Sequence, residues 1–559
     1  MSRDFYRTLR RAFGWMVVLF SMTAQIHATV RLPAIFGDHM VLQQEAKLPV
    51  WGWAAPGETV TVTFAKQKRS AVAGSDGKWR VDLEPVNPAS EPARLTVTGK
   101  DNTIVCDDVL VGDVWIVSGQ SNMEFGLQND SRGKEAIASA TDSQIRMFFV
   151  PWATALQPRT NIGSNMPPSP LNGKWLVCSP EVMAANWAWH GFSAVAYYFA
   201  RDIQGATKHP LGMIATYKGG TPAQAWTSVS GLEEDEHLTH YVAEHQKLVE
   251  HFETAKLEFP KLRADWEIAR RQWKTNSDIA KANGHPLREN SAPKPPTDPD
   301  GGFNAPGNLF NGMVAPLIPY AIKGVIWYQG EGNGNNIREG AEYAYVFPRM
   351  ISDWRAQWGQ GDFPFLYVQL PNINGRARSP SEGSWAWVRD AQFKTLSLPN
   401  TGMAVTIDVG EAENLHPPDK IYVGQRLALA ARHIAYGEDV AYSGPIYEAM
   451  KVEGNQIRLT FKHAESGLMI GTPPPNAEGK IIPPGDELQG FGIAGDDQKF
   501  VWAKAVIENG AVVVHSDEVE HPAAVRYDWA QNPFGNLYGK NGLPASPFRT
   551  DDWPAPMGK

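Results

Sequence analysis

One serine, one histidine and two acidic side chains offer the chemistry of ester or amide hydrolysis. Ser121 follows a buried-type apolar run, and His416 comes three residues after Glu413. A serine hydroxyl is a poor nucleophile until a base takes its proton, and an imidazole is suited to this because its pKa lies near neutral pH. A carboxylate that fixes the ring tautomer completes such a site. Its spacing makes Glu413 the first candidate for this acid, and Asp408, at the end of another apolar run, is the second.

These residues follow segments that are expected to form a parallel sheet. Helical patterns alternate with short apolar runs, which predicts an α/β fold whose strands are covered by helices. Since ligands of open α/β sheets bind beyond the carboxyl ends of the strands, the polar loops should meet at one edge. The expected strands are Val114–Val117, Met213–Tyr217, Val325–Tyr328, Phe365–Gln369 and Ala404–Ile407, and the expected helices are Phe192–Ile203, Ala386–Leu398 and Val423–Ile434.

Glycine-rich turns after the second and third expected strands supply candidate oxyanion donors. Only glycine lets backbone N–H groups approach a developing oxyanion closely. We expect the amides of Ser121 and Gly220 to contribute, with Gly219 as a further candidate. The side chain of either Gln329 or Asn333 would add a third donor.

Several other side chains near these loops are candidates for contact with a substrate. Gln120 precedes the serine, and Glu331 either contacts substrate or orients the loops. Trp187, Trp189 and Trp226 could stack on a sugar ring, although most tryptophans serve as core residues.

The N-terminus and the composition limit the class of protein. Residues 1–28 combine Arg3, Arg7, Arg10 and Arg11 with an apolar stretch and small residues, the pattern of a signal peptide, which predicts a secreted or periplasmic protein. No other run is long enough for a membrane helix. The net charge of −8 argues against nucleic-acid binding. Cys106 and Cys178 allow one disulfide without requiring it.

The remaining pattern divides the 559 residues into regions. Residues 29–107 contain short alternating strands typical of a β-sandwich, residues 108–437 form the α/β region, and residues 438–559 return to β patterns. A charged helical insertion covers about 231–300, and Pro260 predicts that it breaks into a helical hairpin over or beside the site.

Four histidines in this insertion invite a comparison with metal sites. They are His237, His240, His245 and His251. No H-E-x-x-H pair occurs, and the segment is highly charged rather than arranged to lock ligands in place. We therefore predict no metal and no cofactor.

Five sequence blocks in order resemble the sialate O-acetylesterase family of SGNH-type esterases. The blocks are Gly119–Met123, Gly219-Gly220-Thr221 with Trp226, Asn311-Gly312-Met313, Gly324–Glu331, and His416-Pro417 with Lys420. The resemblance implies an SGNH-like three-layer domain, with Ser121 as nucleophile and His416 as base. Related sequences usually carry an aspartate just before the histidine, whereas Glu413 and Asn414 stand there in this chain.

The resemblance implies an exported carbohydrate O-acetylesterase that releases acetate from an O-acetylated sugar or glycan through an acetyl-enzyme. One alternative is an acetylesterase for plant polysaccharide, such as acetylated xylan or pectin side chains. Another is a non-catalytic carbohydrate-binding protein, in which the β regions and tryptophans bind the sugar.

Overall fold

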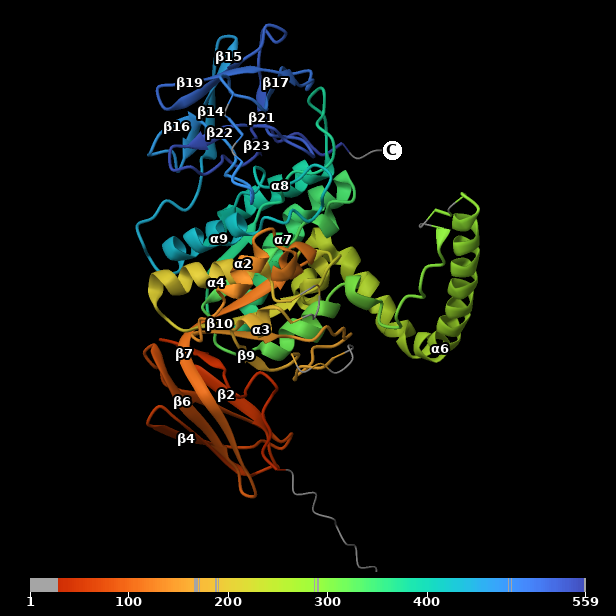
Figure 1. Ribbon diagram of the computed structural model, residues 1–559, viewed down its shortest axis with the longest axis vertical. Helices are drawn as coiled ribbons and strands as arrows, with labels where there is room; N and C mark the ends of the chain where they lie inside the picture. Colours follow the sequence, from red (N-terminus) through yellow and green to blue (C-terminus); the bar gives the residue numbers. More distant parts are fainter. Residues whose placement is uncertain are drawn as a thin grey trace, which may run out of the picture.

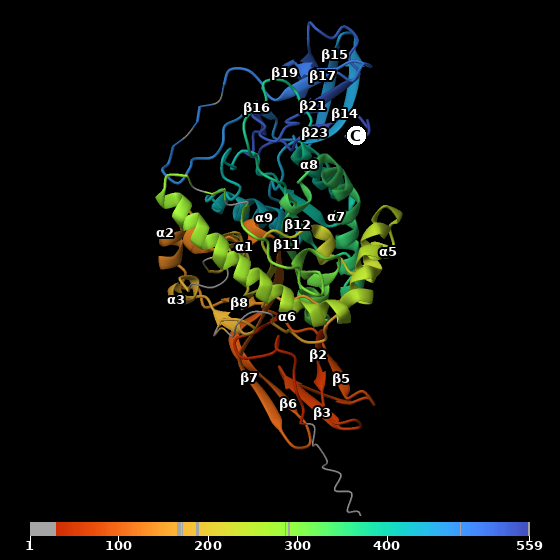
Figure 2. The same ribbon diagram turned by 90° about the vertical axis from the view of Figure 1, so that its right-hand side faces the viewer.

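A computed structural model describes residues 29–164, 169, 171–185, 189, 191–285, 287–288, 291–480, 482–483 and 485–556. An α/β body lies in the middle of an elongated molecule, with a β region at each end (Figures 1 and 2). The expected signal peptide, residues 1–28, and Trp187 lie outside the described residues.

The α/β body is built on a sheet with strand order β13-β12-β11-β7-β10-β8-β9. Every neighbouring pair is parallel except β8 and β9. The strands are β7 (Thr103–Gly119), β8 (Ile145–Phe149), β9 (Trp175–Val177), β10 (Leu211–Tyr217), β11 (Gly324–Tyr328), β12 (Phe365–Val368) and β13 (Thr401–Ala404). The five expected strands are all present, and β13 begins and ends three residues earlier than its apolar run predicts.

Helices cover both faces of this sheet. Trp115 of β7 packs against Phe199 of α4, whereas Trp327 of β11 packs against Trp354 of α7. Trp327 is the cross-strand partner of Ser118, which is three residues from Trp115, so the two tryptophans point to opposite faces. The main helices are α4 (Ala194–Thr207), α7 (Ile337–Trp358), α8 (Ser384–Lys394) and α9 (Ile421–Ile434).

The terminal regions are built mainly of strands. In the N-terminal region, β2 (Leu48–Trp53) pairs with β5 (Lys78–Leu83). The strands β3 (Thr59–Phe64), β4 (Gln67–Val72) and β6 (Ala89–Thr98) form a sheet with the first part of β7, which therefore runs from this region into the central sheet. The C-terminal region holds two four-stranded sheets. The first has the order β14 (Ile446–Glu453), β15 (Gln456–Lys462), β20 (Ala511–His515) and β19 (Lys504–Glu508). The second has the order β18 (Val501–Trp502), β17 (Phe491–Ala494), β21 (Ala524–Tyr527) and β23 (Phe548–Arg549).

The insertion is a long helix rather than the expected helical hairpin. Helix α6 (Thr239–Ala282) continues through Pro260, and it projects from the body and changes direction along its length (Figure 1). A proline inside a helix removes one hydrogen bond and can kink the helix without ending it, which is why the expected break is wrong. No helix in the described part of the chain combines the length and apolar character needed to span a membrane.

Both cysteines are buried and free, so the optional disulfide is absent. Cys106 lies in β7 of the N-terminal sheet, whereas Cys178 directly follows β9 at the edge of the central sheet.

Gly119 closes β7 at the point where the chain turns toward Ser121. Its φ is +134°, and a Cβ at this position would lie 2.1 Å from the Tyr328 carbonyl oxygen. The next residue donates its backbone N–H to the same carbonyl at 2.9 Å. Only glycine allows the two strand ends to approach this closely.

We predict that Gly119→Ala lowers the free energy of unfolding by about 3 kcal/mol or more, because it adds backbone strain and a clash with a carbonyl. Gly57→Ala is the matched control: Gly57 also has a positive φ, of +78°, but open space around it. The control should lose about 1–2 kcal/mol. Equal losses in urea unfolding would show that the contact with Tyr328 is not the constraint.

Candidate active site

Ser121 and His416 are 295 positions apart in the sequence and lie next to each other in the structure. The Nε2 of His416 lies 2.8 Å from the Oγ of Ser121. Ser121 begins the short helix α1 (Ser121–Glu124) directly beyond β7, and His416 lies in the loop between β13 and α9. Both side chains line a cavity of about 900 Å³ at the carboxyl ends of the parallel strands. This arrangement permits proton transfer from the hydroxyl to the imidazole.

Neighbouring groups fix the position of the His416 ring. The backbone N–H of His416 donates to the Asn414 side-chain oxygen at 3.0 Å. The indole of Trp189 meets the imidazole edge-on, with ring centroids 4.5 Å apart and an interplanar angle of 82°. Trp189 itself packs against Phe125, so the contact is anchored to the apolar core.

Burial and a nearby cation keep His416 uncharged. Desolvation, followed by the charge of Lys420, lowers the pKa of His416 to about 4. A neutral imidazole is the form that accepts the serine proton. The base is therefore ready to act over the whole neutral range.

Neither expected acid contacts this imidazole. Glu413 is exposed and makes no hydrogen bond with His416. Asp408, the second candidate, is buried in a two-pronged ion pair with Arg426, at 2.6 Å for both hydrogen bonds, and also accepts from Tyr538 at 3.1 Å. The Asp408 prediction is wrong because its carboxylate serves this ion pair instead. Among the described residues, no carboxylate is hydrogen-bonded to His416.

A buried polar network lies beneath the two reacting groups. Asn122, next to the serine, accepts a hydrogen bond from Lys420 Nζ at 2.5 Å and donates to Glu331 Oε1 at 2.5 Å. The same amide nitrogen donates to the Leu415 carbonyl at 3.0 Å, which ties the histidine loop to the serine loop. Glu331 therefore orients the loops, which is the alternative role that the sequence left open.

Burial shifts the pKa values of both charged members of this network. It lowers the pKa of Lys420 to about 7, with Glu331 acting in the opposite direction. It raises the pKa of Glu331, although Asn122 and Lys420 oppose the shift. The second oxygen of Glu331 is buried without a hydrogen-bond partner in the described structure.

Of the expected backbone donors to an oxyanion, the N–H groups of Ser121 and Gly220 are not hydrogen-bonded within the described structure, whereas that of Gly219 is. Ser121 and Gly220 line the cavity, and no hydrogen bond among the described residues uses either backbone N–H. The Gly219 N–H instead donates to Glu124 Oε2 at 2.6 Å. Backbone donors of this kind stabilise a developing oxyanion most when they are not already paired.

The two expected side-chain donors, Gln329 and Asn333, hydrogen-bond to neighbouring protein groups instead. Gln329 donates to the Thr221 carbonyl at 3.2 Å and to Asn333 Oδ1 at 2.8 Å. Asn333 donates to Gln224 Oε1 at 2.9 Å. Both are buried and neither lines the cavity, so their assignment to the oxyanion hole is wrong.

The expected substrate contacts are partly met. Gln120 and Glu331 line the cavity, although Gln120 also accepts from the Gly332 N–H at 2.9 Å. Trp226 is wrongly assigned to substrate, because it is fully buried, donates to Thr221 at 3.0 Å and packs on Trp327.

Sequence reasoning missed several groups in the cavity wall. They are Glu124, Lys218, Gln224, Tyr241, Asn304 and Glu339. Glu124 lies three residues after the serine, directly after the block Gly119–Met123, and was the easiest to find. Tyr241 and Asn304 belong to the insertion or to the segment after it, and no local pattern places them at the site. The described residues contain no cluster of three or more side chains that could hold a metal ion.

The Ser121–His416 pair, the free backbone donors and the cavity define a serine-type carboxylic ester hydrolase. Comparison with known proteins agrees. The family model described as "Carbohydrate esterase, sialic acid-specific acetylesterase" matches residues 304–433. The sialate O-acetylesterase of Rattus norvegicus is 30% identical over 488 residues, covering 81% of this chain and 83% of that protein. The human sialate O-acetylesterase is 28% identical, covering 77% and 76%.

A solved structure is also similar along almost the whole chain. A carbohydrate acetylesterase from Xanthomonas citri has 34% identity and a TM-score of 0.73, covering 94% of this chain and all of that one. This chain therefore belongs to the sialate O-acetylesterase family.

The low pKa of His416 predicts an unusual pH profile. The imidazole must be neutral to accept a proton, and its pKa is lowered to about 4. We therefore expect kcat/KM for p-nitrophenyl acetate to fall only as the pH drops through about 4, rather than near the ordinary histidine value of about 6.5. Tryptophan fluorescence at each pH separates titration from unfolding. An acid limb centred at 6 to 7 in a folded protein contradicts this electrostatic description.

Proposed function

We propose that this protein is an exported carbohydrate O-acetylesterase with an SGNH-like catalytic domain, acting on O-acetylated sugars or glycans. The observation that carries the proposal is the 2.8 Å contact between Ser121 and His416 at the wall of a polar cavity. The names of the relatives, which are sialate and carbohydrate acetylesterases, support the acyl group and the sugar alcohol. The signal-peptide pattern of residues 1–28 supports export.

The proposed reaction forms and then clears an acetyl-enzyme. Ser121 Oγ attacks the acetyl carbonyl while His416 Nε2 takes its proton, and the N–H groups of Ser121 and Gly220 stabilise the oxyanion. The sugar oxygen leaves with the proton from His416. A water molecule then attacks the acetyl group, giving up a proton to His416, and acetate departs as the serine is restored.

The geometry supports a serine–histidine dyad for these steps. No carboxylate among the described residues contacts His416, and the ring is held instead by Trp189 and the Asn414 turn. Glu413 remains the acid that sequence spacing favours, and its contribution can be measured directly.

The sialate O-acetylesterase relatives support an acetylated sialic acid as substrate, and the alternative, an acetylesterase for plant polysaccharide such as xylan, can be tested against it. Three carboxylates, from Glu124, Glu331 and Glu339, line the cavity with one lysine, Lys218. Burial raises the pKa of both Glu124 and Glu331, and Lys420 lies close to Glu331, so these carboxylates do not by themselves exclude an anionic sugar. Acetate release from acetylated sialic acid, xylan and rhamnogalacturonan, compared by kcat/KM, separates the two candidates.

Replacing the nucleophile tests the activity itself. We expect Ser121→Ala to lower kcat for p-nitrophenyl acetate by at least about 10³-fold, because the covalent route is lost. Ser131→Ala, which removes an exposed hydroxyl outside the cavity, should retain full activity. Labelling by a fluorophosphonate should disappear in the first variant alone. Undiminished turnover in Ser121→Ala would refute the assignment and favour a carbohydrate-binding protein.

The role of Glu413 is tested by Glu413→Gln. If the dyad acts without it, kcat should fall less than about tenfold, whereas loss of an orienting acid typically costs about 10⁴. Glu465→Gln is the control, because Glu465 is also exposed and does not line the cavity. A loss of thousands of fold confined to Glu413→Gln would overturn the dyad.

A further inference from the structure

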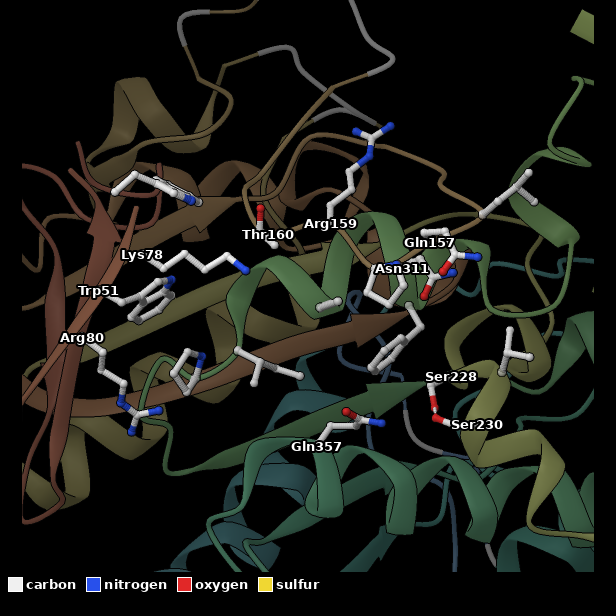
Figure 3. Close-up of a pocket in the computed structure, with 18 of the residues that line it drawn as sticks. Trp51, Lys78, Arg80, Gln157, Arg159, Thr160, Ser228, Ser230, Asn311 and Gln357 are labelled. Atoms are coloured by element: carbon white, nitrogen blue, oxygen red, sulfur yellow. Dashed lines mark hydrogen bonds between the residues drawn. The ribbon is translucent and has the colours of Figure 1, made fainter. Parts of the chain in front are cut away.

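A second large cavity lies between the N-terminal β region and the first turns of α6. Its volume is about 1200 Å³, larger than that of the catalytic cavity. One wall carries Trp51 of β2 and Lys78 of β5, and the opposite side carries Ser228 and Ser230 (Figure 3). None of the described residues lines both cavities.

The wall offers the groups that bind sugars. Trp51 is half-buried, with its ring held against Phe36 at a centroid distance of 4.8 Å. Lys78 extends into the cavity and also pairs with Asp76 at 3.2 Å. Gln357 lines the cavity from helix α7, and its amide nitrogen donates to Asp353 Oδ1 at 3.3 Å (Figure 3). Aromatic faces that cover the apolar side of a ring, combined with a few polar groups, are the usual composition of small-ligand sites.

His245 adds a buried hydrogen-bond acceptor to this cavity. The residue is 5% exposed, and its Nδ1 lies 3.0 Å from the Pro306 carbonyl oxygen. A carbonyl only accepts, so Nδ1 carries the proton and Nε2 presents a lone pair. Nε2 has no hydrogen-bond partner among the described residues, and the atom is not fully buried. A sugar hydroxyl is a suitable donor to it.

One face of helix α6 connects the two cavities. Tyr241 lines the catalytic cavity, while His245 and Val249 line the second. These positions are four residues apart, so they lie on one stripe of the helix over about 12 Å. Both cavities therefore border the same face of α6, and a glycan chain of several units would be needed to occupy them together.

We propose that this cavity is a second glycan-binding site, which holds pyranose units of the substrate away from the acetyl ester. The inference rests on the proposed function and extends it, because it assigns the enzyme to oligomeric or polymeric glycans rather than to free sugars. The ligand chemistry is a pyranose with free hydroxyls, which a neutral or an acidic glycan can supply.

Binding to the full-length Ser121→Ala protein tests the site without turnover. Isothermal titration with xylohexaose and with 3′-sialyllactose distinguishes the neutral from the acidic source. In that background, Trp51→Ala removes the stacking surface, and Ser230→Ile narrows the cavity without disturbing the N-terminal core. We expect each to weaken binding of at least one sugar about tenfold or more, whereas Trp553→Ala, a half-buried tryptophan outside the cavity, should not.

Kinetics with Ser121 intact provide the second readout. Both cavity variants should raise KM for acetylated xylan or an acetylated sialoglycan several-fold while kcat/KM for p-nitrophenyl acetate stays unchanged. If Trp51→Ala does not fold, Ser230→Ile decides alone. Absence of sugar binding, or binding and KM that Ser230→Ile leaves unchanged, overturns the inference. Failure of the esterase assignment is separately visible as full activity in Ser121→Ala.

Discussion

The contact between Ser121 and His416 depends on a buried amide that holds two loops together. Asn122 accepts a hydrogen bond from Lys420, donates to Glu331 and donates to the backbone carbonyl of Leu415. The serine thus has a neighbour that reaches the histidine loop, although 295 positions separate the two reacting residues. In a low-dielectric interior such hydrogen bonds are strong, and an unpaired member is costly, so the loops have little freedom to separate.

The same burial determines the electrostatics of the base. Desolvation and the Lys420 charge both oppose protonation of His416. The transient imidazolium is therefore costly unless something offsets it. The lowered pKa of Lys420, about 7, means that this neighbour can shed its charge near neutral pH. Glu331, whose Oε2 is unpaired, supplies negative charge close to Lys420. The network that positions the loops thus also moderates the charge that forms between them.

The sequence was sufficient for the elements with strong local patterns. Five apolar runs appear as parallel strands, and Ser121, His416 and Gly220 meet at their carboxyl ends because strand topology alone brings those loops together. Strand β8 was not expected, since Arg146 interrupts its apolar run while pairing with Asp108 at 2.6 Å. Helix α7 was also missed, with Gly340 and Pro348 interrupting its pattern.

Side-chain roles were less predictable, because they depend on partners distant in sequence. Gln329 and Asn333 have side-chain N–H groups suited to an oxyanion hole. These groups instead donate to the Thr221 carbonyl and to Gln224 Oε1, respectively. Asp408 follows an apolar run, as a triad acid would, yet Arg426 of α9 pairs with it. Residue type and spacing show which groups can do the chemistry. Which of them remain unpaired is decided by tertiary packing, and an active site requires unpaired groups.

The helical insertion illustrates the same dependence on a larger scale. Its charged sequence indicates a solvent-exposed segment, and most of α6 beyond its first turns is exposed. Its buried residues are Tyr241, Val242 and His245, all within the first two turns. The helix is therefore anchored where it contacts the body, and the anchoring turns are those that wall the two cavities. Tyr241 and Val242 belong to the main hydrophobic core, so the first turns of α6 are part of the core as well as of the cavity walls.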